Sequence, residues 1–324
     1  MRRRALLAVV PILAGAGRAR AQTAAKTARV GVITGLGEQD KDTKARLAAL
    51  RQGLAERGWR EGQNLTIEVR YAPDTAERAR TLAAELLAFK PDVAVIQAPA
   101  MPAMLEAKSA VPIVFLLGAD PVGVKWVESL ARPGRNVTGL TGPESDVGAK
   151  WVEFLTEVAP AVRHIVVIRG LGSSVSFGPA IDRAAAQRGI DTTYFTVGSL
   201  AEIEAAIAAA AAKPNSGLVL PTDAFTTAQR HRVVDLAMRH KLPLCAGSEP
   251  VAAAGGLVVY AVDTVDIYRR SAVYVDRILK GERPADLPVQ RPTLYTLSLN
   301  LRTAAALGLT VSPILLARAD EIIE

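Results

Sequence analysis

The sequence predicts an α/β protein built as two doubly wound parallel-sheet lobes with a ligand cleft between them. Short β-branched runs alternate with segments of helical periodicity from Ala28 onward, which is typical of a parallel sheet covered by helices. A segment rich in glycine and proline at 132–143 interrupts this alternation, which then starts again. A length of 324 residues, with 50% hydrophobic but only 5% aromatic residues, suits two such lobes better than one core.

Four strand–helix units precede the interruption. The strand predicted at 29–34 leads into a helix at 40–59 whose leucines recur on one face. The next strand, at 64–71, alternates apolar and polar residues, which predicts a half-exposed position at a sheet edge. The remaining elements are a helix at 75–89, a strand at 92–97, a short helix at 101–109, a strand at 112–117 and a helix at 121–131.

The second half repeats this architecture, and segment 132–143 is predicted to cross between the halves. Its elements are a helix at 147–158, a strand at 164–168, a helix ending at 188, a strand at 192–197, a helix at 200–212, a strand at 217–220, a helix at 226–240, and strands at 242–246 and 256–262. A helix at 265–279 ends at Lys280-Gly281, which is a good stop signal. An extended stretch at 292–299 and short closing helices finish the chain.

The helix that follows the second set of strands predicts a further crossing back to the first lobe. The expected N-terminal lobe therefore comprises residues 28–142 and 264–290. The expected C-terminal lobe comprises residues 143–263 and 291–324.

Residues 1–21 have the pattern of a cleavable signal peptide. Three arginines precede an apolar run at 5–16, and Ala19-Arg20-Ala21 has the small-x-small form of a cleavage site. The run is too short to span a bilayer. Export through the Sec route or the twin-arginine route is compatible with this segment. We expect no lipid anchor there, because no cysteine follows the cleavage site.

Removal of this segment changes the charge of the chain. The formal net charge falls from +7 to +2, because the segment carries five arginines and no acidic residue. A nearly balanced chain gives no reason to expect a nucleic-acid partner. Cys245 is the only cysteine, so neither an internal disulfide nor a Cys-rich metal site is expected.

The residue types that enzymes use are poorly represented. The three histidines, His164, His231 and His240, have no metal-binding spacing. The turn Gly35-Leu36-Gly37 resembles a dinucleotide-binding turn, but Asp40 stands where the third glycine would be, and an acid there opposes a pyrophosphate. We therefore expect no metal, no cofactor and no catalysis. The alternative, a two-lobe dinucleotide-dependent enzyme, would need an acid–base residue.

We expect the ligand site at the carboxyl ends of the predicted strands, because solutes bind at that edge of parallel sheets. Three carboxylates lie there, and each has a second explanation at the start of a helix. Asp120 precedes Pro121, which is a preferred helix start. Either Thr222 or Asp223 is expected to cap the helix that follows them. Glu249 precedes Pro250, which indicates a further helix start where a carboxylate complements the helix dipole. The sequence leaves open whether each carboxylate caps a helix or contacts a ligand.

Several segments carry a resemblance to a known family. These are 51–64, 120–123, 129–140, 255–257, 279–281 and 304–310. In order and spacing the chain resembles the ABC transporter substrate-binding protein family, whose better-known members bind tryptophan and related aromatic amino acids. The resemblance implies a type 1 periplasmic binding fold with three crossings, which closes on a small solute and presents it to an ABC permease in the inner membrane.

The resemblance also implies a periplasmic monomer without cofactor. Its implied ligand-binding residues are Gly35, Leu36, Gln97, Ala98, Pro99, Ala119, Asp120, Gly172, Ser173, Thr222, Asp223, Ser248, Glu249 and Tyr260. The chain departs from the family pattern at two loops, 98–99 and 170–174, so the expected solute is an amino acid or a related small organic solute. For a zwitterion, Asp223 or Glu249 would pair with the ammonium group. A periplasmic sensory subunit is the alternative to a transport protein.

Overall fold

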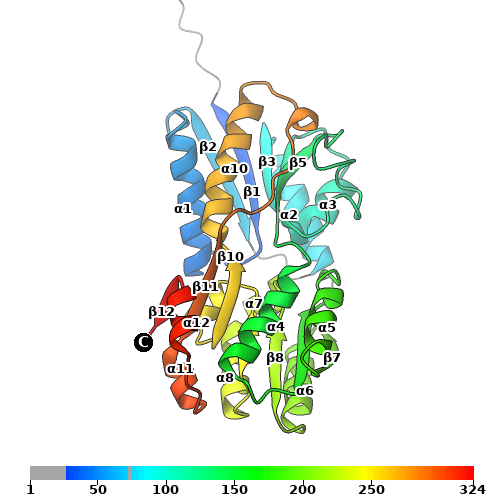
Figure 1. The fold of residues 1–324 in the computed structure, drawn as a ribbon. Helices are drawn as coiled ribbons and strands as arrows, with labels where there is room; N and C mark the ends of the chain where they lie inside the picture. The colour runs from blue at the N-terminus through cyan, green and yellow to red at the C-terminus, as the bar shows by residue number, and fades with distance from the viewer. Residues whose placement is uncertain (1–26, 72–74, 172) are drawn as a thin grey trace, which may run out of the picture.

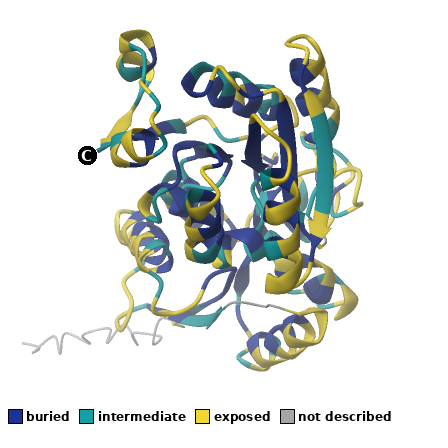
Figure 2. Ribbon diagram, turned by 90° about the horizontal axis from the view of Figure 1, so that it is seen from below, coloured by how far each residue is buried: buried dark blue, intermediate teal, exposed yellow. Residues whose placement is uncertain are grey.

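The computed structural model describes residues 27–71, 75–171 and 173–324. Two sheets lie end to end, each covered by helices, and their strands form the buried layer of the molecule (Figures 1 and 2). The helices turn their exposed faces outward (Figure 2). The predicted signal peptide lies outside the described residues.

The first sheet has the strand order β2-β1-β3-β4-β5, and all its pairs are parallel. Its strands are β1 (Ala28–Thr34), β2 (Leu65–Tyr71), β3 (Val93–Gln97), β4 (Ile113–Gly118) and β5 (Val137–Thr141). Its helices are α1 (Lys41–Ala55), α2 (Ala76–Ala88), η1 (Ala98–Ala100) and α3 (Met101–Glu106). The predicted edge position of β2 is confirmed. We call this sheet with its helices the first lobe.

Two predictions for the end of this lobe are wrong. The expected helix at 121–131 is a turn in which Lys125 has a positive φ of 59°, a conformation that ends the helical path after one turn. The expected crossing at 132–143 contains β5, the fifth strand of the sheet. Glycine is uncommon in strands, so the sequence pattern does not indicate one here. A Cβ at Gly139 would lie 2.1 Å from the carbonyl oxygen of Phe115, so only glycine allows this pairing.

The second sheet has the order β12-β11-β10-β9-β8-β6-β7. Its strands are β6 (His164–Gly170), β7 (Asp191–Val197), β8 (Ser216–Leu220), β9 (Leu244–Ala246), β10 (Val258–Val262), β11 (Tyr295–Asn300) and β12 (Glu321–Ile323). The β10–β11 pair is antiparallel. Strand β12 is absent from the sequence prediction, because three residues carry no periodicity. We call this sheet with its helices the second lobe.

The helices of the second lobe agree closely with the predicted pattern. They are α4 (Val147–Val158), α5 (Gly178–Ala186), α6 (Leu200–Ala211), α7 (Ala224–Ala228), α8 (Arg230–Arg239), α9 (Pro250–Ala253), α11 (Leu301–Ala306) and α12 (Pro313–Arg318). The single helix predicted at 226–240 is two helices that meet at Gln229. Among the residues that the structure covers, no helix is both long and apolar enough to cross a bilayer.

The chain passes between the sheets three times. It leaves the first sheet after β5, returns after β10 into α10 (Thr264–Leu279), and passes through η2 (Pro284–Asp286) to β11 (Figure 1). Helix α10 packs beside α1, where Tyr268 and Ala272 are fully buried in the first-lobe core. A Cβ at Gly53 of α1 would lie 2.8 Å from the Cβ of Ala272. Glycine therefore permits the close approach of the two helices.

Candidate functional site

The two sheets turn their carboxyl ends toward each other, and a direct contact joins the lobes there. Asp40 follows β1 and caps α1, and Arg230 begins α8 in the second lobe. The Nη2 atom of Arg230 donates to Oδ2 of Asp40 at 2.5 Å, and both side chains are close to nine-tenths buried. Burial by itself would raise the pKa of Asp40, but hydrogen bonds from Arg230 and the backbone N–H of Asp42 lower it below the usual range.

On the first-lobe side, Gln97 ties the strand ends together. Its Oε1 accepts hydrogen bonds from the backbone N–H of Gly35 at 2.8 Å and from the Tyr268 hydroxyl at 3.2 Å. A Cβ at Gly35 would lie 2.9 Å from Nε2 of Gln97, so a larger residue there would displace the end of the Gln97 side chain. Leu36 is buried directly after this turn. The predicted residues of these two loops thus lie next to each other.

The other predicted loops of the first lobe carry small or exposed residues. Ala98 and Pro99 begin η1. Ala119 and Asp120 are exposed after β4, and Oδ1 of Asp120 accepts from the backbone N–H of Gly123 at 2.9 Å. The predicted helix cap at Asp120 is therefore wrong in its detail, because the carboxylate caps a turn and no helix follows it.

On the second-lobe side, both oxygens of the Asp223 carboxylate accept hydrogen bonds from within the lobe. It caps α7 by accepting from the backbone N–H of Thr226 at 2.8 Å and from the Thr226 hydroxyl at 2.6 Å. It also accepts from the backbone N–H of Gly170 at 3.2 Å, which joins the end of β6 to α7. Burial raises the pKa of Asp223, and these hydrogen bonds oppose the rise. Of the two residues predicted to cap this helix, Thr222 and Asp223, Asp223 is the one that does so.

Three hydroxyl groups form a chain beside Asp223. The Ser248 hydroxyl lies 3.2 Å from that of Thr222 and accepts from that of Thr227 at 2.8 Å. Ser173, in the loop after β6, has a buried hydroxyl without a hydrogen-bond partner. Gly172 lies outside the described residues.

Glu249 belongs to a polar chain that reaches the first lobe. Its Oε2 accepts from the Thr264 hydroxyl at 2.9 Å, and Nε of Arg46 donates to the same hydroxyl at 2.9 Å. Burial raises the pKa of Glu249, and the hydrogen bond from Thr264 and the nearby Arg46 charge oppose the rise. Glu249 stands at the start of α9 directly before Pro250, as the sequence predicts, and its side chain makes no cap hydrogen bond.

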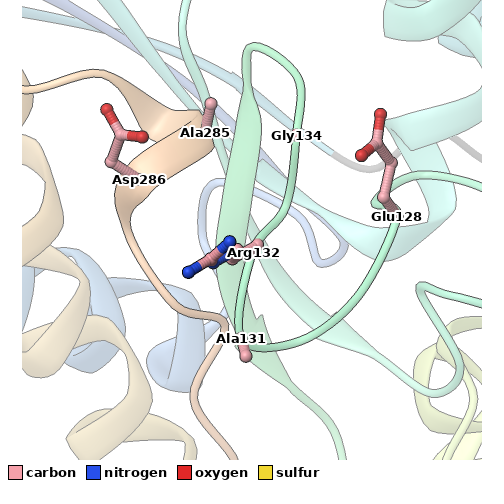
Figure 3. Close-up of a pocket in the computed structure, with 6 residues that line it drawn as sticks. All are labelled: Glu128, Ala131, Arg132, Gly134, Ala285 and Asp286. Carbon is pink, nitrogen blue, oxygen red and sulfur yellow. The ribbon is translucent and has the colours of Figure 1, made fainter.

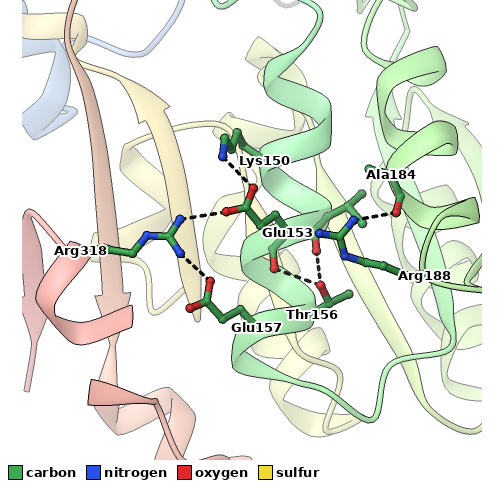
Figure 4. A network of polar contacts seen from close by, with 8 residues as sticks. Lys150, Glu153, Thr156, Glu157, Ala184, Arg188 and Arg318 are labelled. Atoms are coloured by element: carbon green, nitrogen blue, oxygen red, sulfur yellow. Dashed lines mark hydrogen bonds and ion pairs between the residues drawn. The ribbon is translucent and has the colours of Figure 1, made fainter. Parts of the chain in front are cut away.

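Tyr260 lies in an aromatic group on the face of the second sheet that α4 covers. Its ring centroid is 5.1 Å from that of Phe154 and 5.4 Å from that of Tyr295. Arg318 lies over the Phe154 ring and pairs with two glutamates of α4, Glu153 and Glu157, both at 2.9 Å (Figure 4). Tyr260 is thus held by ring packing, apart from the hydroxyl chain.

Sequence reasoning missed Arg230, and Asp40 entered it only as an argument against nucleotide binding. The two residues are 190 positions apart, and each occupies an ordinary helix start. Two further polar atoms were also missed, Oδ2 of Asp42 and Oγ1 of Thr43, which are buried without a hydrogen-bond partner. No pattern in the sequence marks either atom.

Two surface hollows lie away from these residues. One, of about 490 Å³, has Glu128 and Asp286 on opposite sides and Arg132 between them (Figure 3). The other, of about 380 Å³, lies at the amino end of β1 near Ala28 and Trp59. Neither hollow is lined by a predicted ligand residue. Within the part of the chain that the structure describes, no three His, Cys, Asp or Glu residues gather as a metal site.

Solved structures resemble this fold over most of its length. A conserved domain protein from Vibrio cholerae O1 biovar El Tor strain N16961 is 29% identical, covers 92% of this chain and all of its own, and superposes with a TM-score of 0.82. An ABC domain in complex with L-Trp from Streptococcus pneumoniae is 24% identical, with the same coverage and TM-score. These likenesses confirm the predicted fold, two α/β lobes of the type 1 periplasmic binding kind.

The sequence comparisons agree with the structural ones. A tyrosine-binding protein of Clostridioides difficile strain R20291 is 24% identical over 266 residues, which cover 80% of this chain and 75% of that protein. A family model described as ABC transporter substrate binding protein matches residues 29–323. The resemblance found in the sequence motifs is therefore confirmed, and the chain belongs to the ABC transporter substrate binding protein family.

Proposed function

We propose that this chain is the exported binding protein of an ABC importer, which captures an amino acid or a related small organic solute between its lobes and delivers it to a permease. The observation that carries the proposal is the meeting of the two sets of strand ends, where Asp40 and Arg230 join the lobes. A relative named for tyrosine binding and a similar fold solved with L-Trp support the choice of an amino acid.

Closure of the lobes follows from contacts that a solute makes to both of them. Such a solute favours the closed arrangement by its differential affinity for that arrangement. The lobes we propose are residues 28–142 with 264–290 and residues 143–263 with 291–324. The hinge would then comprise the three connections, and Thr264 lies at one of them with hydrogen bonds to both Arg46 and Glu249.

The proposed walls of the cleft differ in chemistry. Leu36, Ala98, Pro99 and Ala119 supply an apolar first-lobe wall. Ser173, Thr222 and Ser248 supply hydroxyl groups from the second lobe. Small residues at 98 and 119 leave room for a side chain of the solute, and the hydroxyl groups suit its polar atoms.

The family is one of binding proteins, so the chain is not an enzyme, as the lack of an acid–base or nucleophile arrangement in the sequence predicted. The periplasmic location, the cleaved signal peptide at 1–21 and the monomeric state are part of the proposal. The location and the signal peptide support one another, because an importer of this kind takes its solute outside the inner membrane.

The test is a thermal-shift screen on protein freed of solute by unfolding and refolding. The twenty protein amino acids, small organic acids and NAD would each be added at high concentration. A solute at 100 times its Kd stabilises the folded state by about 2.7 kcal/mol, which is a readily measured shift in Tm. The proposal expects a shift with at least one amino acid and none with NAD. A shift with NAD alone would reject it.

A further inference from the structure

Two polar atoms in the first turn of α1 are buried without a hydrogen-bond partner. They are Oδ2 of Asp42 and Oγ1 of Thr43, and Thr43 has no exposed surface. Among the described residues, the one other such side-chain atom is the Ser173 hydroxyl in the second lobe. Buried polar atoms are nearly always paired with protein, ordered water or an ion, so each of these atoms can take a partner from outside the chain.

Asp42 lies where the two lobes meet, and Thr43 follows it in the same helical turn. Helix α1 starts beyond the carboxyl end of β1, and Asp40 in its cap position binds Arg230 of the second lobe. Asp42 Oδ2 is 4.0 Å from Nη2 of Arg230, which places it at the same contact. Ser173 follows β6, whose last residue Gly170 is bound by Asp223.

Arg230 does not donate a hydrogen bond to Oδ2 of Asp42. Its Nη2 donates to Asp40, and its Nη1 donates to the Thr227 carbonyl at 3.2 Å. The 4.0 Å separation from Asp42 exceeds hydrogen-bond length. Two carboxylates therefore share one guanidinium group, which leaves an unbalanced negative charge that favours a cationic ligand group.

The carboxylates proposed from the sequence are less suited to that role. Asp223 accepts three hydrogen bonds from Thr226 and Gly170. Glu249 accepts from Thr264, which also binds Arg46. Asp42 is thus the carboxylate at the lobe contact with a buried and unoccupied oxygen.

We propose that Asp42 pairs with the ammonium group of the amino-acid solute and that the Thr43 hydroxyl binds a polar atom beside it. This inference rests on the proposed function. It identifies the solute as one that carries a primary or secondary amine, and it replaces Asp223 and Glu249 as the partners of that amine. The Ser173 hydroxyl would contact the same solute from the second lobe, so that binding draws the lobes together.

Titration calorimetry on solute-free full-length protein tests the pairing. The probes are L-tyrosine, L-tryptophan and L-leucine, each compared with the carboxylic acid that lacks only its amino group. The wild type should bind at least one amino acid and bind the matching acid far more weakly. Asp42→Asn should weaken binding of the amino acid at least about 30-fold, because it removes one charge of a buried pair.

The matched control is Asp235→Asn, which removes an exposed carboxylate from α8 and should leave affinity unchanged. Thr43→Val supplies a readout that needs no solute. It should raise the Tm of the solute-free protein, because it replaces an unsatisfied buried hydroxyl by a methyl group of similar shape. It should also weaken binding of the amino acid.

The outcomes separate the two proposals. If the Kd of an amino acid for Asp42→Asn lies within threefold of its Kd for the wild type, the role of Asp42 is overturned. The proposed function still stands in that case. Equal affinity for an amino acid and its amine-free acid has the same two consequences. A lower Tm for Thr43→Val overturns the role of Thr43. If the wild type binds none of the amino acids in the wider screen, the amino-acid class itself is overturned, and with it the pairing.

Discussion

The guanidinium group of Arg230 and the carboxylate of Asp40 form an ion pair at 2.5 Å across the contact between the lobes. Their side chains are 11% and 12% exposed. A buried pair of this kind depends on both partners, since removing one leaves an uncompensated charge. The relative position of the lobes and the charge at the cleft are therefore coupled through these two residues.

Arg230→Ala should open the cleft and weaken solute binding. The variant leaves the Asp40 and Asp42 carboxylates at the lobe contact without their cation. We expect affinity to fall at least tenfold, about 1.4 kcal/mol, and the radius of gyration in small-angle X-ray scattering to rise. Arg232→Ala is the matched control, because Arg232 pairs with Glu204 inside the second lobe. A scattering curve and affinity equal to those of the wild type would contradict the prediction.

The contribution of the Asp40–Arg230 ion pair to stability should appear in the pH dependence of the free energy of unfolding. A carboxyl whose folded-state pKa lies below its ordinary value of 3.8 binds fewer protons when folded than when unfolded. Its contribution is therefore present above pH 3.8 and is lost as the pH falls below that value. Asp40→Asn keeps a good helix cap but removes the charge. Urea unfolding between pH 3 and pH 6 should show a shallower acid loss for Asp40→Asn than for the wild type. Parallel curves would count against this account.

Asp223→Ala should lower stability more than Asp120→Ala. Asp223 caps α7 and binds Gly170 from β6, and loss of a cap alone costs about 0.5–2 kcal/mol. Asp120 is exposed and caps only a turn, so its loss should cost less than about 0.5 kcal/mol. Urea unfolding at neutral pH compares the two variants. Equal losses would show that the Asp223 hydrogen bonds are not what holds β6 to α7.

Gly53→Ala should destabilise the protein although alanine favours helices. Its Cβ would lie 2.8 Å from Ala272 Cβ and 2.9 Å from the Arg269 carbonyl oxygen, so α1 and α10 must move apart. Overpacking of this kind costs about 1–3 kcal/mol, which exceeds the gain in helix propensity of about 1 kcal/mol for glycine to alanine. Gly37→Ala is the control, since a Cβ there meets nothing within 4 Å. A stabilised Gly53→Ala variant would refute the close packing.

The sequence predicted most elements correctly because periodicity and terminal signals are local. Helix α4 has the predicted bounds, and α10 begins one residue before its predicted start and ends where predicted. The error after Asp120 has a local cause as well. An Asp-Pro pair starts turns as readily as helices, and the positive φ of Lys125 is invisible in the pattern.

The candidate site was predictable only as a set of loops. Parallel strands bring their carboxyl ends to one edge, so the loops around Gln97, Thr222 and Ser248 could be named without coordinates. Which carboxylate is free could not be named, because that depends on hydrogen bonds made elsewhere in the fold. Asp223, one of the two candidates by sequence, accepts hydrogen bonds from Gly170 and Thr226.

By itself, the sequence determined the alternation of strands and helices, the two-lobe α/β class and the family. These features depend on the order of apolar, polar and turn residues along short segments, and on motifs whose spacing survives in the chain. Only the tertiary structure decided that Arg230 meets Asp40 across 190 positions and that Asp42 lies beside them with a buried oxygen that accepts no hydrogen bond. Charge balance at a contact between lobes is a property of the assembled fold, because each partner is an ordinary helix-start residue until the other lobe lies against it.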